Sequence, residues 1–178
     1  RDAAPHQQSP SALRQEGMTV HVPQAAKHLP LDYDLYIYSD AVQPTNPERA
    51  ELIKQKLESR TMSYFRAVGE IMPLYHRRIA VSGTHGKTTT TAMLTLVLAE
   101  AGYDPTAIVG SVIKALNSNV RVGQDKENFI VEACEYRAHM LELHPTAIII
   151  TNIEEDHLDY YRDLDHIQAT FQRYLDLL

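Results

Sequence analysis

The stretch of the sequence with the strongest chemical signature is residues 81–91, which read VSGTHGKTTTT. Glycines at positions 83 and 86 allow backbone N–H groups to turn onto phosphate oxygens, and a helix that starts after them adds a favourable dipole. Lys87 is then placed to reach the β- and γ-phosphates of a nucleotide, and the Thr88 hydroxyl to face Mg²⁺. Val81 stands at the first-glycine position of the usual G-x-x-x-x-G-K-[ST] motif, so this is a shortened form. The alternative is an ordinary glycine-containing turn, which the strand-to-helix context disfavours.

Two carboxylates follow a predicted strand and could supply the metal partner that a phosphate loop needs. Glu132 comes directly after the apolar run at residues 129–131, and Glu135 is close behind. A solvated carboxylate at a strand end is the alternative for either residue. Beside a phosphate loop we favour Glu132 as a ligand of Mg²⁺, which prefers oxygen ligands.

A second polar cluster covers residues 151–159, which read TNIEEDHLD. It follows a predicted strand, so its polar groups emerge at the carboxyl end of that strand, where α/β sheets place ligand sites. His157 could ligate a metal or position a phosphate. From spacing alone, a hydrogen-bonded Asp-His pair on the surface is an equally good interpretation.

The elements that must position these residues alternate between short β-rich runs and helical stretches, which is typical of α/β proteins with a mainly parallel sheet. Around the phosphate loop, strands are predicted at residues 78–82, 107–109, 129–132 and 147–151. Helices are predicted at residues 87–101, where Gly102 ends the helix, and at about 165–177.

The region before residue 74 has its own pattern. Its predicted elements are a short helix at 11–17, an extended run at 18–22, a strand at 34–39 and helices at 47–59 and 62–72. Asn46, just ahead of Pro47, is predicted to cap the first of the two longer helices. Pro73 breaks the chain and residues 75–78 have the pattern of a linker, so we predict a domain boundary there.

Composition limits the partners and the compartment. Of 178 residues, 17 are Lys or Arg and 23 are Asp or Glu, which gives a formal net charge of −6. A nucleic-acid partner would need a basic excess and is not expected. No apolar run is long enough to span a bilayer, so membrane insertion is not expected either. The single cysteine, Cys134, and the lack of a signal-peptide pattern favour a cytoplasmic location.

Three motifs together carry a resemblance to a known family. Residues 83–93 (GTHGKTTTTAM), 132–136 (EACEY) and 151–159 (TNIEEDHLD) occur in this order and at fitting distances. In combination they resemble the Mur ligases, the ATP-dependent amide-bond ligases of peptidoglycan precursor synthesis. The histidine within the loop and the run of threonines resemble most the alanine-adding branch of that family, and short stretches before residue 42 are similar too.

The resemblance implies a fold and a domain plan. The expected class is α/β, with a partial Rossmann-like domain at residues 1–74 that binds the UDP-sugar. A partial P-loop, ATP-binding domain with a mainly parallel sheet is expected at residues 75–178. Against the three-domain plan of the family the chain reads as truncated at both ends, without the C-terminal domain. We expect these residues alone to form no amide bond, because domain closure must shield the acyl phosphate from water.

The resemblance also assigns roles to individual residues. Lys87 resembles the phosphate-binding lysine, Thr88 and Glu132 resemble ligands of Mg²⁺, and His157 resembles the ligand of a second Mg²⁺. The expected catalytic residues are Lys87, Glu132 and His157. The residues expected to line the ATP site are Gly83, Thr84, His85, Gly86, Lys87, Thr88 and Thr89. The residues expected to face the substrate are Gly110, Ser111, Asn119 and Asn152; Ser111 departs from a more usual glycine pair.

The implied reaction joins L-alanine to the lactyl carboxylate of UDP-N-acetylmuramate through an acyl phosphate, with ATP and Mg²⁺ as cofactors. Lys87, the loop N–H groups and two Mg²⁺ ions would offset the repulsion between a carboxylate and a triphosphate. Two alternatives stay open. One is the murein tripeptide ligase of cell-wall recycling, which shares the loop and the chemistry. The other is a P-loop nucleotide-binding module that is no ligase.

Overall fold

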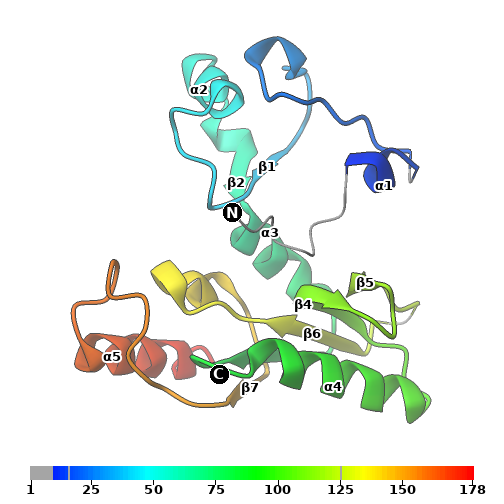
Figure 1. The fold of residues 1–178 in the computed structure, drawn as a ribbon, viewed down its shortest axis with the longest axis vertical. Coiled ribbons are helices and arrows are strands. Elements are labelled where there is room, and N and C mark those ends of the chain that lie inside the picture. The colour runs from blue at the N-terminus through cyan, green and yellow to red at the C-terminus, as the bar shows by residue number, and fades with distance from the viewer. Residues whose placement is uncertain (1–9, 16, 125) are drawn as a thin grey trace. The chain divides into compact units, whose positions relative to one another are not determined.

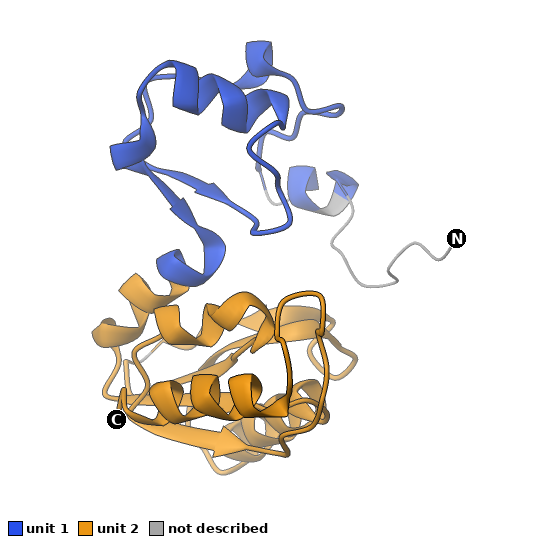
Figure 2. Ribbon diagram, turned by 90° about the vertical axis from the view of Figure 1, so that its left-hand side faces the viewer, with its two compact units in different colours: residues 1–67 blue, residues 68–178 orange. Residues whose placement is uncertain are grey.

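The computed structural model describes residues 10–15, 17–124 and 126–178. The chain divides into two compact units, residues 1–67 and residues 68–178, which Figure 2 colours separately. The division falls within the helix α3 (Tyr64–Ile71), a few residues before the boundary expected from the sequence. In the described part of the chain, no helix is both long and apolar enough to cross a membrane.

The first unit contains a two-stranded parallel sheet. In this sheet β1 (Tyr36–Tyr38) pairs with β2 (Thr61–Ser63). The other elements of the unit are α1 (Pro10–Gln15), η1 (Ala26–His28), α2 (Pro47–Lys54) and η2 (Glu58–Arg60). The predicted cap of α2 is confirmed, because Asn46 Oδ1 accepts the backbone N–H groups of Glu48 at 3.0 Å and Arg49 at 3.3 Å.

Two sequence expectations for this unit are wrong. Residues 62 and 63 were expected to begin a helix but lie in β2, because pairing with β1 satisfies their backbone groups and the helix α3 begins only at Tyr64. The helix expected at 47–59 ends at Lys54. There the chain turns back through Lys56, whose φ is +56°, and the N–H of Leu57 donates to the carbonyl of Leu52 at 3.0 Å. This hydrogen bond closes the helix end without a glycine.

The second unit is a five-stranded sheet with helices packed on it (Figure 1), and the sheet is mainly parallel, as the sequence predicts. Its strands are β3 (Arg77–Ser82), β4 (Thr106–Ile113), β5 (Ser118–Arg121), β6 (Asn128–Glu132) and β7 (Ala147–Ile150), in the spatial order β5-β4-β6-β3-β7. β3 pairs in parallel with both β6 and β7, β4 is parallel to β6, and β5 is antiparallel to β4. The edge strand β5 was not predicted, since its residues (SNVR) are mostly polar.

Helical segments precede, connect and follow these strands. They are η3 (Met72–Leu74), α4 (Lys87–Glu100), η4 (Tyr136–Glu142) and α5 (Leu164–Leu175). Residues 75–78 are no linker, because β3 already begins at Arg77 and the Tyr75 ring is buried, 5.0 Å from the Phe129 ring. The predicted end of α4 is confirmed: Gly102, with a φ of +85°, follows the helix and the N–H of Tyr103 donates to the carbonyl of Leu98.

The core of the second unit lies along the central strands. Ala80 and Val81 of β3 and Ile130 and Val131 of β6 are almost completely buried. The helix α4 packs on β3, β4 and β6. Because β3 lies between β6 and β7 and all three run in parallel, their carboxyl ends meet at one edge of the sheet. The loops that follow these three strands therefore converge.

Two threonines of α4, Thr91 and Thr95, face inward, whereas two of its large apolar side chains face outward. The buried hydroxyls of Thr91 and Thr95 donate to the carbonyls of Lys87 at 2.8 Å and of Thr91 at 2.7 Å. Met93 and Val97 are exposed. A buried hydroxyl is tolerated here because it is hydrogen-bonded within its own helix.

Candidate active site

The phosphate loop of residues 83–86 joins the end of β3 to α4. Gly83 has a φ of +127° and Gly86, the N-cap of α4, a φ of +82°; both angles are unfavourable for residues with a side chain. A Cβ on Gly83 would also lie 2.8 Å from the carbonyl oxygen of Asn152. The two glycines that the sequence singled out are therefore needed by the backbone of this loop.

Asn152, from the segment after β7, clamps the phosphate loop. Its Oδ1 accepts the N–H of His85 at 2.9 Å, and its Nδ2 donates to the carbonyl of the same residue at 3.1 Å. Its own carbonyl accepts the N–H of Thr84 at 3.1 Å. Asn152 was expected to face substrate; in this structure its amide is engaged with the loop backbone, so it acts on the site through the loop.

Lys87 is the first residue of α4, and its ammonium group points back into the loop. It donates to the carbonyl oxygens of Gly83 at 2.6 Å and Thr84 at 3.1 Å, and to Glu135 Oε1 at 3.0 Å. An ammonium has three N–H donors, so these acceptors account for all of them.

Thr88 and Glu132, the two residues expected to hold one Mg²⁺, are in direct contact. The Thr88 hydroxyl donates to Glu132 Oε1 at 3.0 Å, and the N–H of Gly110 on β4 donates to Glu132 Oε2 at 2.7 Å. Gly110 also leaves room for this carboxylate, since a Cβ there would lie 2.7 Å from Glu132 Oε1. A hydroxyl and a carboxylate facing one another are the oxygen donors that Mg²⁺ takes.

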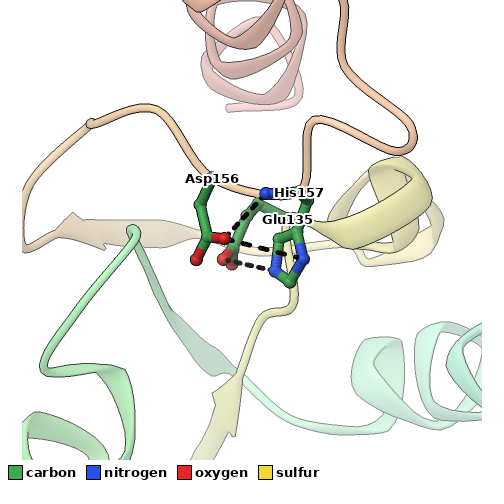
Figure 3. Close-up of side chains that lie close together, drawn as sticks. All are labelled: Glu135, Asp156 and His157. Atoms are coloured by element: carbon green, nitrogen blue, oxygen red, sulfur yellow. Dashed lines mark hydrogen bonds and ion pairs between the residues drawn. The ribbon is translucent and has the colours of Figure 1, made fainter.

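Glu135, Asp156 and His157 form a second cluster, and Figure 3 shows their side chains turned toward one another. One ligand atom from each lies within 4.8 Å of the others. Glu135 is only 3% exposed, and its Oε1 lies 3.5 Å from His157 Nε2. Its other oxygen, Oε2, is buried and has no hydrogen-bond partner among the described residues. Asp156 Oδ1 accepts the N–H of His157 at 2.7 Å.

Unusual backbone angles hold this cluster in place. Arg137, Ala138 and His157 have φ values of +51°, +58° and +53°, in the left-handed region that residues other than glycine rarely adopt. Such strain gathers at functional sites, where the surrounding structure enforces it.

Two tyrosines tie the same segments together. The Tyr161 hydroxyl donates to the carbonyl of Glu135, and the Tyr136 hydroxyl donates to Asp159 Oδ2 at 2.7 Å. Burial raises the pKa of Tyr161 to about 12, so this hydroxyl stays protonated and available as a donor at neutral pH. Burial, and after it the charge of Glu135, also raises the pKa of the nearby Cys134 thiol, which disfavours the reactive thiolate.

The remaining predicted residues lie on the same loops or on the β4–β5 hairpin. The Thr84 hydroxyl accepts the N–H of Glu154 at 2.9 Å and thereby fixes the loop, whereas the His85 side chain and Thr89 are exposed. Ser111 lies on β4, and Asn119 Nδ2 on β5 donates to the carbonyl of Val109 at 3.4 Å.

The sequence analysis named Glu135 as a second carboxylate after the strand but did not place it among the expected site residues. The sequence shows its three-residue spacing from Glu132, but neither its burial nor its contacts with Lys87 and His157.

Known proteins resemble this chain over most of its length. Residues 81–176 match the Mur ligase middle domain. The UDP-N-acetylmuramate--L-alanine ligase of Lachnospira eligens is 40% identical over 163 residues, which are 92% of this chain and 35% of that protein. The crystal structure of UDP-N-acetylmuramate-alanine ligase MurC from Thermotoga maritima superposes with a TM-score of 0.75 at 31% identity, covering 91% of this chain and 37% of that one.

A second solved structure matches about equally well in shape. It is the UDP-N-acetylmuramate:L-alanyl-gamma-D-glutamyl-meso-diaminopimelate ligase (MPL) from Neisseria meningitides, with a TM-score of 0.78 at 25% identity, covering 97% of this chain and 59% of that one. The fold defines an α/β domain in which the inner strand β3 leads through a glycine-containing loop into the helix α4. The chain belongs to the Mur ligase family, a family of ATP-dependent ligases. It spans about a third of the length of the curated relatives that it matches.

Proposed function

We propose that this chain is the nucleotide-binding part of an ATP-dependent ligase that joins L-alanine to the lactyl carboxylate of UDP-N-acetylmuramate. The observation that carries the proposal is the cluster at the carboxyl edge of the sheet. There the Lys87 ammonium and the Thr88 hydroxyl each contact a carboxylate from the end of β6. The choice of L-alanine rests on the activity for which the 40% identical relatives are named.

Residues 83–89 offer the phosphates of ATP two favourable features, free backbone N–H groups at the start of α4 and a positive charge. The N-cap of α4 is Gly86, so no side chain caps the first N–H groups of the helix among the described residues. Uncapped N–H groups and the helix dipole favour an anion at this end. Lys87 adds a full positive charge there, and we infer that these residues hold the triphosphate.

The two acidic clusters suit Mg²⁺. Thr88 and Glu132 would hold one ion through a hydroxyl and a carboxylate oxygen, and His157 would take part in holding a second. Glu135 Oε1 lies 3.5 Å from His157 Nε2, and its buried Oε2 has no hydrogen-bond partner among the described residues, so a cation bound there would satisfy this oxygen. When bound, Mg²⁺ supplies Lewis-acid stabilisation of the charge on the transferring phosphoryl group.

The reaction brings together two anions, the substrate carboxylate and the triphosphate. The chain's own residues lower the barrier by offsetting the repulsion between them. Lys87 offsets negative charge with an ammonium group that is largely shielded from water, where its field is screened less. Asn152 holds the N–H groups of Thr84 and His85, and the Thr84 hydroxyl holds the segment after β7. The loop that leads to the uncapped N–H groups at the start of α4 is therefore already in place when phosphate arrives.

The first unit is proposed to hold the UDP-sugar. It contains a pocket of about 410 Å³ between β1 and α2. The Tyr38 ring and the Arg49 guanidinium line this pocket and lie 4.0 Å apart. A planar aromatic surface and a cation are groups that suit a nucleobase and a diphosphate. The proposal keeps the cytoplasmic location that the sequence favours.

One observation favours a second candidate, a ligase that attaches a murein tripeptide in place of L-alanine. The Neisseria enzyme of that type superposes on this chain with a TM-score of 0.78. The residues described above serve both reactions equally, because they act on ATP and on the acyl group. The acceptor alone separates the two candidates.

The experiment that tests the proposal measures ADP release by the full-length protein that carries these residues. The protein is supplied with Mg-ATP and UDP-N-acetylmuramate and is offered L-alanine, glycine, L-serine or the murein tripeptide. Turnover with L-alanine is expected. Turnover with the tripeptide alone would transfer the assignment to the second candidate, and ATP binding without turnover for any acceptor would refute a ligase.

A further inference from the structure

Lys87 is occupied by protein acceptors, and one of them carries a full negative charge. Two of its N–H groups donate to the loop carbonyls of Gly83 and Thr84, and the third is directed at Glu135 Oε1 at 3.0 Å. The carbonyl contacts can persist when a phosphate binds, because they lie within the loop. The Glu135 contact cannot, because a phosphate oxygen needs the same N–H donor.

On the side away from Lys87, the Glu135 carboxylate lies close to a second pair of side chains, Asp156 and His157. The Glu135 side chain is buried, Oε1 also lies 3.5 Å from His157 Nε2, and Oε2 has no partner among the described residues. A buried carboxylate oxygen without a partner is unfavourable. A divalent cation between Glu135, Asp156 and His157 would satisfy that oxygen, since one ligand atom from each lies within 4.8 Å of the others.

We propose that Glu135 is a positioning residue that couples nucleotide and cation binding. Without ligands, its carboxylate holds the third N–H of Lys87. When a divalent cation attracts the carboxylate toward Asp156 and His157, Lys87 is released to a phosphate oxygen. Each ligand thus favours the other's binding. This inference rests on the proposed ATP-binding function. It adds that the Glu135 carboxylate passes from Lys87 to the cation as Lys87 passes from Glu135 to the phosphate.

The backbone around Glu135 suits a small side-chain movement. Tyr161 holds the main-chain carbonyl of Glu135, and the left-handed residues Arg137 and Ala138 set the chain direction just after it. The main chain is therefore fixed at Glu135 and just after it, and only the carboxylate needs to shift between its two partners.

The test is the affinity for ATP with and without Mg²⁺, measured by titration calorimetry on the full-length protein. Glu135→Gln keeps the shape of the side chain but removes its charge, so Lys87 loses its anionic competitor. We expect Glu135→Gln to bind metal-free ATP about fivefold more tightly than wild type, the difference between a charged and a neutral hydrogen bond. The gain in affinity on adding Mg²⁺ should shrink by at least the same factor. The matched control is Glu142→Gln, an exposed glutamate of η4, which should behave as wild type.

The outcomes separate the possible failures. Weaker ATP binding by Glu135→Gln with and without Mg²⁺ would overturn the inference, because a merely structural role predicts a loss in both conditions. Unchanged affinities would overturn it as well. If wild type binds no ATP at all, the proposed function itself fails. Glu135→Asp keeps the charge and should keep the Mg²⁺ dependence; should Glu135→Gln not fold, loss of that dependence in Glu135→Asp would contradict the coupling.

Discussion

Glu132 and Glu135 are three residues apart at the end of β6, yet their surroundings differ. Glu132 is half-buried, and each of its oxygens accepts one hydrogen bond, from Thr88 and from Gly110. Glu135 is buried and shares one oxygen between Lys87 and His157, and its other oxygen has no partner among the described residues. The Glu132 carboxylate accepts hydrogen bonds from uncharged donors that hold it in place. The Glu135 carboxylate instead lies between an ammonium and an imidazole, two alternative partners. In the proposed mechanism, one short segment thus presents a fixed ligand and an exchangeable one.

The largest expected effect comes from removing the charge that Glu135 faces. Lys87→Met should lower the rate of ADP release by about 10³-fold, since a preorganised donor to the transferring group is lost. It should also destabilise the protein by about 3 kcal/mol, because it leaves a buried carboxylate unpaired. Turnover assays and urea unfolding measure the two effects. The double variant Lys87→Met/Glu135→Gln should regain most of the stability and none of the activity; a single variant as stable as wild type would contradict the buried pair.

Glu132→Gln should affect metal use more than stability. An amide can still accept the N–H of Gly110 and donate to the Thr88 hydroxyl, so the fold is expected to tolerate it. Losing a charged ligand should lower turnover at fixed Mg²⁺ by about 100-fold, a part of which excess Mg²⁺ recovers. A Mg²⁺ titration of the ADP release rate measures this. A variant with the wild-type Mg²⁺ requirement would show that Glu132 is no ligand.

Gly110→Ala tests whether Glu132 is held as firmly as its two hydrogen bonds indicate. The added Cβ would lie 2.7 Å from Glu132 Oε1 and would push the carboxylate away from Thr88. We expect the Mg²⁺ concentration that gives half-maximal turnover to rise by about tenfold, as for the loss of a supporting contact. Glu135 should be unaffected, so the affinity for metal-free ATP should stay at the wild-type value; a change in it would link the two carboxylates.

The smallest effect concerns the strained backbone beside Glu135. Ala138→Gly should stabilise the protein by about 0.5 kcal/mol, because the relief of the left-handed strain exceeds the entropy that glycine loses on folding. Ala101→Gly, at an ordinary φ of −76°, is the matched control and should destabilise it by a similar amount. Thermal unfolding of both variants measures the difference, and two shifts of the same sign would argue against strain at Ala138.

How much the sequence reveals depends on the local physics, as two helix ends illustrate. Both α2 and α4 end in the same hydrogen-bonded turn with a left-handed residue just after the helix. At α4 that residue is Gly102, and the end was predicted correctly. At α2 it is Lys56, and nothing in its chemistry marks the turn. Buried apolar strands were likewise found, whereas the short β2 and the polar β5 depend on pairing partners that a local pattern does not contain.

One part of the candidate site could likewise be predicted from the sequence, and another part could not. The contact between Thr88 and Glu132 follows from residue types at strand and helix ends, which the sequence displays. The proposed role of Glu135 follows from its burial and from the loop after β7, which brings His157 next to it. Burial of a charged side chain is a property of the whole fold, and a pattern read along one segment does not contain it.

The clamp that Asn152 places on the phosphate loop has a consequence for the entropy of binding. Three hydrogen bonds tie Thr84 and His85 to a residue that follows β7, so this part of the loop is already ordered when the chain has folded. A flexible loop would lose conformational freedom each time it closed around a phosphate, at about 1 kcal/mol or more per residue. Here that cost is met once, during folding, and it is not repeated in each catalytic cycle.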